Sequence, residues 1–159
     1  MATWIERKSA ELKSQKAELD EKQVWGADTV DKLEAAIRRD VARWNELNPG
    51  YRRRIDGVKK LTRSGAFRVY KTSFPPATVD AMLDPESFSV MVEVTTVRQG
   101  EQKPHTESGH LMLAPEKEGF GLKLQSGEAL SFAEASQLLL EPIIESIGKW
   151  LLNPTPRLG

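Results

Sequence analysis

His105 and His110 are the two side chains in this sequence best suited to acid–base chemistry near neutral pH. An imidazole becomes an effective general base when a carboxylate holds it in one tautomer. If His110 lies on a strand between two others that carry Glu93 and Gln125, the three side chains form one polar row. A small hydrolase or isomerase that uses the His110 and Glu93 pair is therefore one functional hypothesis. A polar row on a solvated sheet face has the same pattern and needs no catalysis.

A metal site built on the histidines is not expected. Successive side chains of a strand point to opposite faces, so His105 and Glu107 share one face and His110 lies on the other. The chain contains no cysteine, which excludes thiolate ligands, cysteine nucleophiles and disulfides. The helical H-E-x-x-H spacing is also absent. We expect no metal and no cofactor.

Basic side chains gather between Tyr51 and Lys71, where eight arginines and lysines accompany one aspartate. The candidate binding residues in this segment are Arg52, Arg53, Arg54, Lys59, Lys60 and Arg63. Basic and aromatic side chains together bind single-stranded nucleic acid, and three aromatic residues interleave here. Nucleic-acid binding through residues 51–71 is thus a further alternative. No Gly-rich phosphate loop or zinc-finger spacing accompanies the segment, so it is not the favoured one.

The charge of the chain is zero overall but unevenly distributed. Residues 51–71 carry a net charge of +7, whereas residues 72–134 carry ten acidic and four basic side chains. The charges of the basic segment and of the acidic segment can pair within one chain or between two chains.

The elements that position these residues are strands and amphipathic helices. Residues 88–97 alternate apolar and polar side chains, and residues 108–113 and 120–125 keep the same period, which predicts three antiparallel strands. Matching their apolar faces pairs Val92 with Leu111 and Leu111 with Leu124, and the same register aligns Val90, Leu113 and Leu122 in a second row. Residues 66–72 supply a fourth strand. Residues 77–85 are expected to form a loop, or a turn of helix around Met82 and Leu83, and residues 51–63 a basic connector.

Three helices are predicted around these strands. A peripheral helix over residues 1–25 begins at a capping box formed by Thr3 and Glu6 and ends at Trp25-Gly26. A core helix over residues 28–48, capped by Asp28 or Thr29, has apolar residues at three- and four-residue spacing. A C-terminal helix over residues 131–152 begins at a second capping box, Ser131 and Glu134, and Pro142 is expected to kink it or to break it and begin a new helical segment.

The predicted fold is a single α+β domain over residues 1–159. It consists of an antiparallel meander of about four strands, with two N-terminal helices and one kinked C-terminal helix packed on one face. The sequence has no apolar run long enough to span a membrane and no apolar leader, so we expect a soluble, cytoplasmic protein without a membrane partner.

The peripheral helix gives the favoured functional hypothesis. Its apolar stripe of Ile5, Leu12 and Leu19 is narrow, and Trp4 and Trp25 lie near its ends. A narrow stripe is typical of a helix that lies along the surface of its own chain or of one that pairs with another subunit, and tryptophan is enriched at interfaces. We therefore predict a small, non-catalytic binding or assembly module that forms a homodimer or larger homo-oligomer. The sequence identifies no small-molecule ligand.

Overall fold

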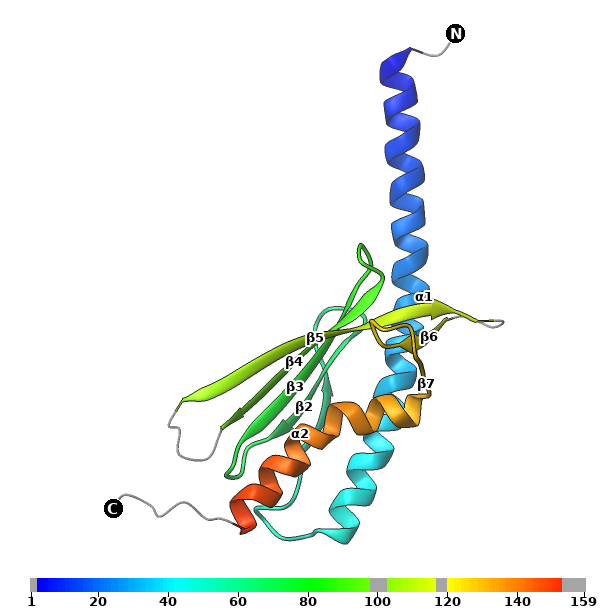
Figure 1. Ribbon diagram of the computed structural model, residues 1–159. Helices are drawn as coiled ribbons and strands as arrows, with labels where there is room; N and C mark the ends of the chain where they lie inside the picture. Colours follow the sequence, from blue (N-terminus) through cyan, green and yellow to red (C-terminus); the bar gives the residue numbers. More distant parts are fainter. Residues whose placement is uncertain (1–2, 98–102, 117–119, 153–159) are drawn as a thin grey trace.

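One long helix, a seven-stranded antiparallel sheet and a C-terminal helix make up the part of the chain that the structure describes (Figure 1). The computed structural model describes residues 3–97, 103–116 and 120–152, with side chains up to residue 149. Its elements are α1 (Trp4–Leu47), β1 (Gly57–Lys60), β2 (Ala66–Lys71), β3 (Ala77–Asp84), β4 (Ser89–Val97), β5 (Pro104–Pro115), β6 (Phe120–Lys123), β7 (Ala129–Leu130) and α2 (Phe132–Leu152). Within the described residues, each strand pairs with the next along the chain.

The sheet curls into a half-barrel whose concave side is covered by α2 and the C-terminal half of α1 (Figure 1). The side chains that fill this concave side come alternately from the strands, as in the buried residues Ala77, Val79, Ala81 and Leu83 of β3. The α+β class and the antiparallel sheet are thus confirmed. The expectation of about four strands was wrong, because β1, β3 and β7 are additional. The loop expected at residues 77–85 is the buried strand β3, and the connector at 51–63 contains β1.

The two N-terminal helices expected at 1–25 and 28–48 are one continuous helix, α1. Gly26 does not end it, because this glycine is a packing residue: a Cβ there would come within 2.6 Å of a methyl group of Leu83. Thr29 does not cap a second helix either. Its hydroxyl donates to the carbonyl of Trp25 one turn back and also lies 3.2 Å from the carbonyl of Phe120. Burial against the sheet therefore outweighed the local stop signals.

Both capping boxes are confirmed. The backbone N–H of Glu6 donates to the Thr3 hydroxyl at 3.2 Å, and the Thr3 N–H donates to the Glu6 carboxylate at 3.1 Å. Ser131 and Glu134 make the same reciprocal pair at the start of α2. Pro142 lies inside α2, which stays helical through it and bends along its path in Figure 1.

The predicted register was correct on one side of β5 and wrong on the other. Leu113 pairs with Leu122, as expected for β5 and β6. On β4, however, Val90 pairs with Leu111 and Val92 with Gly109, a shift of two residues from the expected pairing. A two-residue slip keeps every side chain on its own face, so apolar alternation fixes the face but not the register.

Candidate binding surfaces

His110 and Glu93 lie on the convex face of the sheet, on neighbouring strands but not directly opposite each other. Met91 pairs with His110, and Glu93 pairs with Ser108. The His110 ring instead approaches Ser89, whose hydroxyl lies 3.4 Å from Nδ1. Gln125 follows the end of β6 as an exposed residue. The polar row expected from the sequence is thus spread diagonally over the sheet.

His110 ends a chain of hydrogen bonds at the β3–β4 turn. Ser87 donates its hydroxyl to the Asp84 carboxylate at 2.7 Å, and the hydroxyls of Ser87 and Ser89 lie 2.6 Å apart. The hydrogen bond from Ser87 is the main cause that lowers the pKa of Asp84 below its usual value. Phe88, between the two serines, has a φ of 51°, a conformation that non-glycine residues seldom adopt.

This network contains the atom types of a nucleophile–base chain, but a substrate cannot reach its hydroxyl. Ser89, the serine next to His110, is 1% exposed. A reacting carbonyl must reach both the nucleophile and the base, so a buried hydroxyl has no room for it. Asp84 also accepts the backbone N–H of Glu86, as an Asx turn does. The geometry therefore accounts for the network as the polar lining of a tight, strained turn.

The basic segment is divided among several partners within the protein. Lys60 pairs with Glu34 at 3.2 Å and Asp31 at 3.4 Å on α1, and these contacts raise its pKa. Arg68 makes a bidentate pair with Asp80 across β2 and β3, at 2.6 and 2.8 Å. These ion pairs join neighbouring elements of the fold, so part of the segment's charge is matched internally.

The other basic candidates do not share one element. Arg52, Arg53 and Arg54 are exposed in and after the turn that follows α1, and Arg63 is exposed between β1 and β2. Lys59 lies on β1 with its ammonium 5.2 Å from the centre of the Tyr70 ring.

Lys71 is a basic residue in the core. It is 2% exposed, and its ammonium donates to the carbonyls of Ser73 at 2.7 Å and Pro75 at 3.0 Å. Burial lowers its pKa from 10.5 to about 8. A lysine with a lowered pKa is a candidate nucleophile, but two carbonyls already occupy this one. Its contacts fix the loop after β2.

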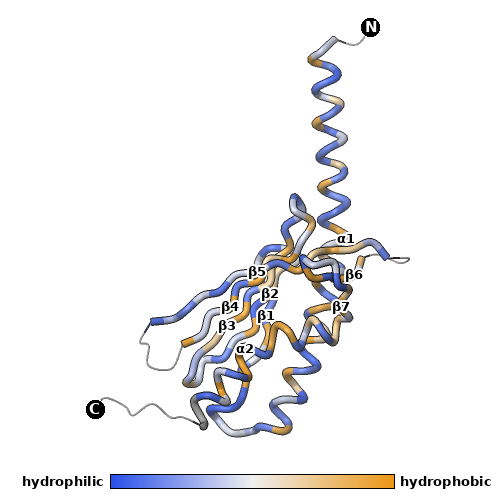
Figure 2. Tube along the Cα trace, viewed as in Figure 1, coloured by the Kyte–Doolittle hydropathy of each residue, from blue (hydrophilic) through white to orange (hydrophobic). Residues whose placement is uncertain are grey.

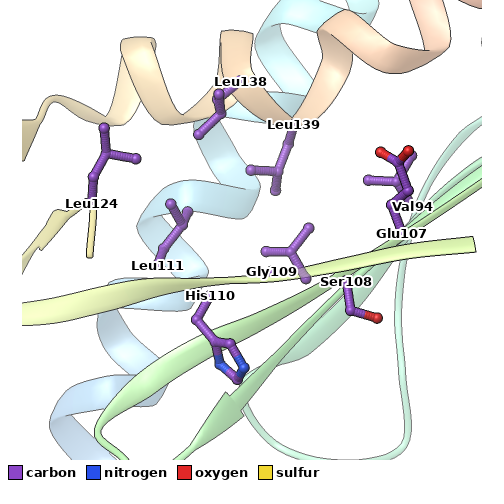
Figure 3. Close-up of a pocket in the computed structure, with 10 residues that line it drawn as sticks. Val94, Glu107, Ser108, Gly109, His110, Leu111, Leu124, Leu138 and Leu139 are labelled. Atoms are coloured by element: carbon purple, nitrogen blue, oxygen red, sulfur yellow. The ribbon is translucent and has the colours of Figure 1, made fainter. Parts of the chain in front are cut away.

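An apolar pocket opens between α2 and the sheet (Figure 3). It has a volume of about 230 Å³ and is lined by Val92, Val94, Glu107, Ser108, Gly109, His110, Leu111, Leu124, Leu138 and Leu139. In Figure 3 the side chains of Leu111, Leu138 and Leu139 point into it, whereas those of Ser108 and His110 point away to the convex face. A Cβ at Gly109 would meet no atom within 4 Å, so this glycine leaves part of the pocket unfilled.

The strand that lines this pocket has an open edge. β5 pairs with β4 over residues 104–112 but with β6 only over residues 112–115. Within the described part of the chain, no strand pairs with residues 104–111 on the side away from β4. Ser108 and His110 therefore lie on the pocket-lining part of β5, and on the side away from β4 no described strand pairs with their backbone.

The N-terminal half of α1 projects beyond the sheet as an arm, defined here as residues 4–21 (Figures 1 and 2). The first contacts between α1 and the body are at Lys22, whose ammonium lies over the Phe88 ring, and Gln23, which donates to the Ser64 carbonyl. Every residue of the arm is exposed, including Trp4, Ile5 and Leu12 at 67%, 61% and 66%. The narrow stripe identified in the sequence thus has no cover in the described chain.

An aromatic corner lies where the arm meets the body. Phe120 packs edge-to-face on Phe88 at 4.7 Å between ring centres and on Trp25 at 6.5 Å. Trp25 remains 45% exposed. The sequence marked Trp25 through its type, but the corner depends on β6 and the β3–β4 turn, which no local pattern brings together.

Comparison with protein-family models, with curated proteins and with solved structures found no match for this chain. Among the described residues, no helix combines the length and apolar character needed to cross a membrane. The described residues also hold no cluster of three or more metal-ligating side chains.

Proposed function

We propose that this protein is an assembly module that self-associates through the arm of α1. The main observation behind the proposal is the exposed apolar stripe of Ile5, Leu12 and Leu19 on the part of α1 that projects beyond the sheet. A helix with exposed apolar residues on one face is more stable when a partner covers that face.

The stripe continues the face by which α1 packs on the sheet. Seven-residue steps from Leu19 reach Gly26 and then Leu33, and both are buried against the body. Each seven-residue step turns only about 20° around a straight helix. The stripe and the sheet therefore lie on the same side of α1, and a partner on the stripe would lie directly beyond the aromatic corner.

This placement favours an antiparallel pair of arms. If two arms ran in parallel about a two-fold axis, both sheets would lie towards that axis at the same height and would collide. An antiparallel pair puts the two bodies at opposite ends. It also sets Leu12 against Leu12 and Ile5 against Leu19, so the stripe is complementary to itself, as a two-fold interface requires.

The charges of the arm favour the same arrangement. Residues 4–16 carry four basic and two acidic side chains, whereas residues 17–21 carry three acidic and no basic ones. In this antiparallel register, residues 17–21 lie beside residues 3–7 of the other arm, where Glu6 and Arg7 cancel, whereas parallel arms would place the three acidic side chains of one arm beside those of the other. Trp4 would then reach the corner formed by Trp25 and Phe88 of the second copy.

Sedimentation and light scattering over a wide range of concentration test the proposal. The wild-type chain should approach twice its 17.8 kDa mass, and Leu12→Asp should return it to the monomer. Leu12 is 66% exposed, so the body should stay folded. The matched control is Ala10→Asp, which adds the same charge on nearly the opposite side of the arm and should leave the dimer intact. A monomer at every concentration, or equal dissociation by both variants, would refute the proposal.

Disulfide cross-linking tests the direction of the arms. Because the sequence contains no cysteine, any disulfide must form between the introduced residues. Chains carrying Ile5→Cys should form a disulfide with chains carrying Leu19→Cys when the two are mixed. Neither should cross-link efficiently to itself. Efficient self-linking of each variant would show parallel arms instead.

A further inference from the structure

We propose that the open edge of β5 and the adjacent pocket form a binding site for an extended peptide segment of another protein. The peptide would add to the sheet beside residues 106–110 and place one apolar side chain in the pocket beneath α2. This inference is independent of self-association through the arm.

The direction of the backbone groups on β5 supports strand addition. The Leu113 N–H donates to the Phe88 carbonyl at 3.1 Å, so Leu113 faces the β4 side. Backbone groups alternate in direction along a strand. Thr106, Ser108 and His110 therefore direct their N–H and C=O groups towards the open edge. A sheet edge with unpaired backbone groups is a template for another strand.

The pocket supplies side-chain selectivity beside that edge. Leu111, Leu138 and Leu139 form apolar walls, and the missing side chain at Gly109 leaves space between the strand and the helix (Figure 3). Leu138 remains 43% exposed. An added strand would direct alternate side chains into this space and the others to the convex face beside Ser108 and His110.

Edge and pocket together indicate the chemistry of the partner. It is an extended segment in which apolar residues alternate with polar ones, because each apolar side chain must face α2 and each polar one must face water. Residues 72–134 have a net charge of −6, so basic residues flanking the segment are favoured. A helical partner would leave the edge groups of β5 unpaired, and a small apolar molecule would use the pocket alone.

The probe is a fluorescently labelled, end-capped peptide, Lys-Thr-Val-Thr-Leu-Thr-Val-Thr-Lys, titrated by anisotropy against the wild-type chain and against Leu12→Asp. We expect saturable binding of similar strength to both. The same peptide with Asp in place of Leu should bind about tenfold more weakly or worse, because a charge would enter the apolar pocket. N-methylation of the Thr residues and N-methylation of the Val and Leu residues should differ, since only one set of N–H groups faces β5.

Two protein variants with matched controls locate the site. Ser108→Pro removes an edge N–H without removing a bond to β4, and it should weaken binding about tenfold, whereas Ser108→Ala keeps the N–H and should not. Gly109→Leu fills the pocket and should abolish binding, whereas Ser108→Leu places the same side chain on the convex face. Thermal melts would verify that each variant is folded.

Several outcomes would overturn the proposal. These are absence of saturable peptide binding, equal effects of the two N-methylated peptides, and undiminished binding by folded Gly109→Leu. Tight binding of octanol with no peptide binding would identify a small-molecule pocket. A dimer of Leu12→Asp that Ser108→Pro dissociates would show that a second copy of this chain occupies the edge.

Discussion

The packing of Gly26 against Leu83 predicts that the effect of Gly26→Ala on stability changes sign when the Leu83 side chain is shortened. A Cβ at position 26 would lie 2.6 and 2.8 Å from the two methyl groups of Leu83, which is closer than carbon atoms pack. Leu83 is 1% exposed, so its side chain has little room to move. Gly26→Ala should therefore cost about 1–3 kcal/mol through overpacking. It should also gain about 1 kcal/mol, because alanine is the better helix former.

The net expectation is that Gly26→Ala lowers the free energy of unfolding by about 1 kcal/mol, the difference between these two effects. Leu83→Ala removes the methyl groups and should itself cost about 2–5 kcal/mol. In the Leu83→Ala background the clash is gone and only the helix gain remains. There, Gly26→Ala should stabilise the protein by up to about 1 kcal/mol.

Urea unfolding of the four proteins in this double-mutant cycle provides the measurement. The reasoning requires opposite signs for Gly26→Ala in the two backgrounds. A glycine that ended a helix in the left-handed conformation would also resist alanine, but the loss would then be the same with and without Leu83. Equal losses would therefore refute both the continuous helix and the close approach of α1 to β3.

Two further predictions concern the sheet. Leu111→Ala should lower the free energy of unfolding by about 2–5 kcal/mol and more than Met112→Ala does, because Leu111 is 3% exposed on the concave face and Met112 faces the convex side; urea melts that give equal losses would contradict this assignment. For Lys71, the unfolded chain binds more protons than the folded one between pH 8 and 10.5, so the stability of the wild type relative to Lys71→Met should rise over that range, by up to about 3 kcal/mol, and a fall would contradict the burial of the charge.

The sequence was sufficient to predict the class of the fold and the faces of its elements. Alternation in residues 88–97 and 120–123 placed the apolar side chains on the concave face, and both capping boxes marked helix starts. Alternation was also present in β3, but alanines at positions 77 and 81 make it weak. Their small side chains are suited to the closely packed middle of a curled sheet, which is known only once α1 and α2 are placed.

Local signals failed where a distant contact decided the structure. Trp25-Gly26 has the form of a helix end, yet the glycine is needed there because Leu83 on β3 leaves no room for a Cβ. The His110 and Glu93 pairing failed to align for a similar reason. Apolar alternation alone does not fix how β5 pairs with β4: the observed register differs by two residues from the expected one, and Gly109 rather than Leu111 lies opposite Val92.

The two candidate surfaces differ in whether the sequence alone could reveal them. The arm could be identified from its sequence, because Ile5, Leu12 and Leu19 mark too narrow a stripe for a core helix. The open edge could not, because it results from unequal neighbours: β5 spans residues 104–115, while β6 pairs with only residues 112–115. Because β6 is shorter than β5, the unpaired part of β5 lies next to the pocket: β6 ends at Lys123, and the next residue, Leu124, lines the pocket. A chain extended along β5 would thus extend the sheet and cover Leu138 in one step, whereas a second copy bound to the arm, as proposed, would change neither the edge nor the pocket.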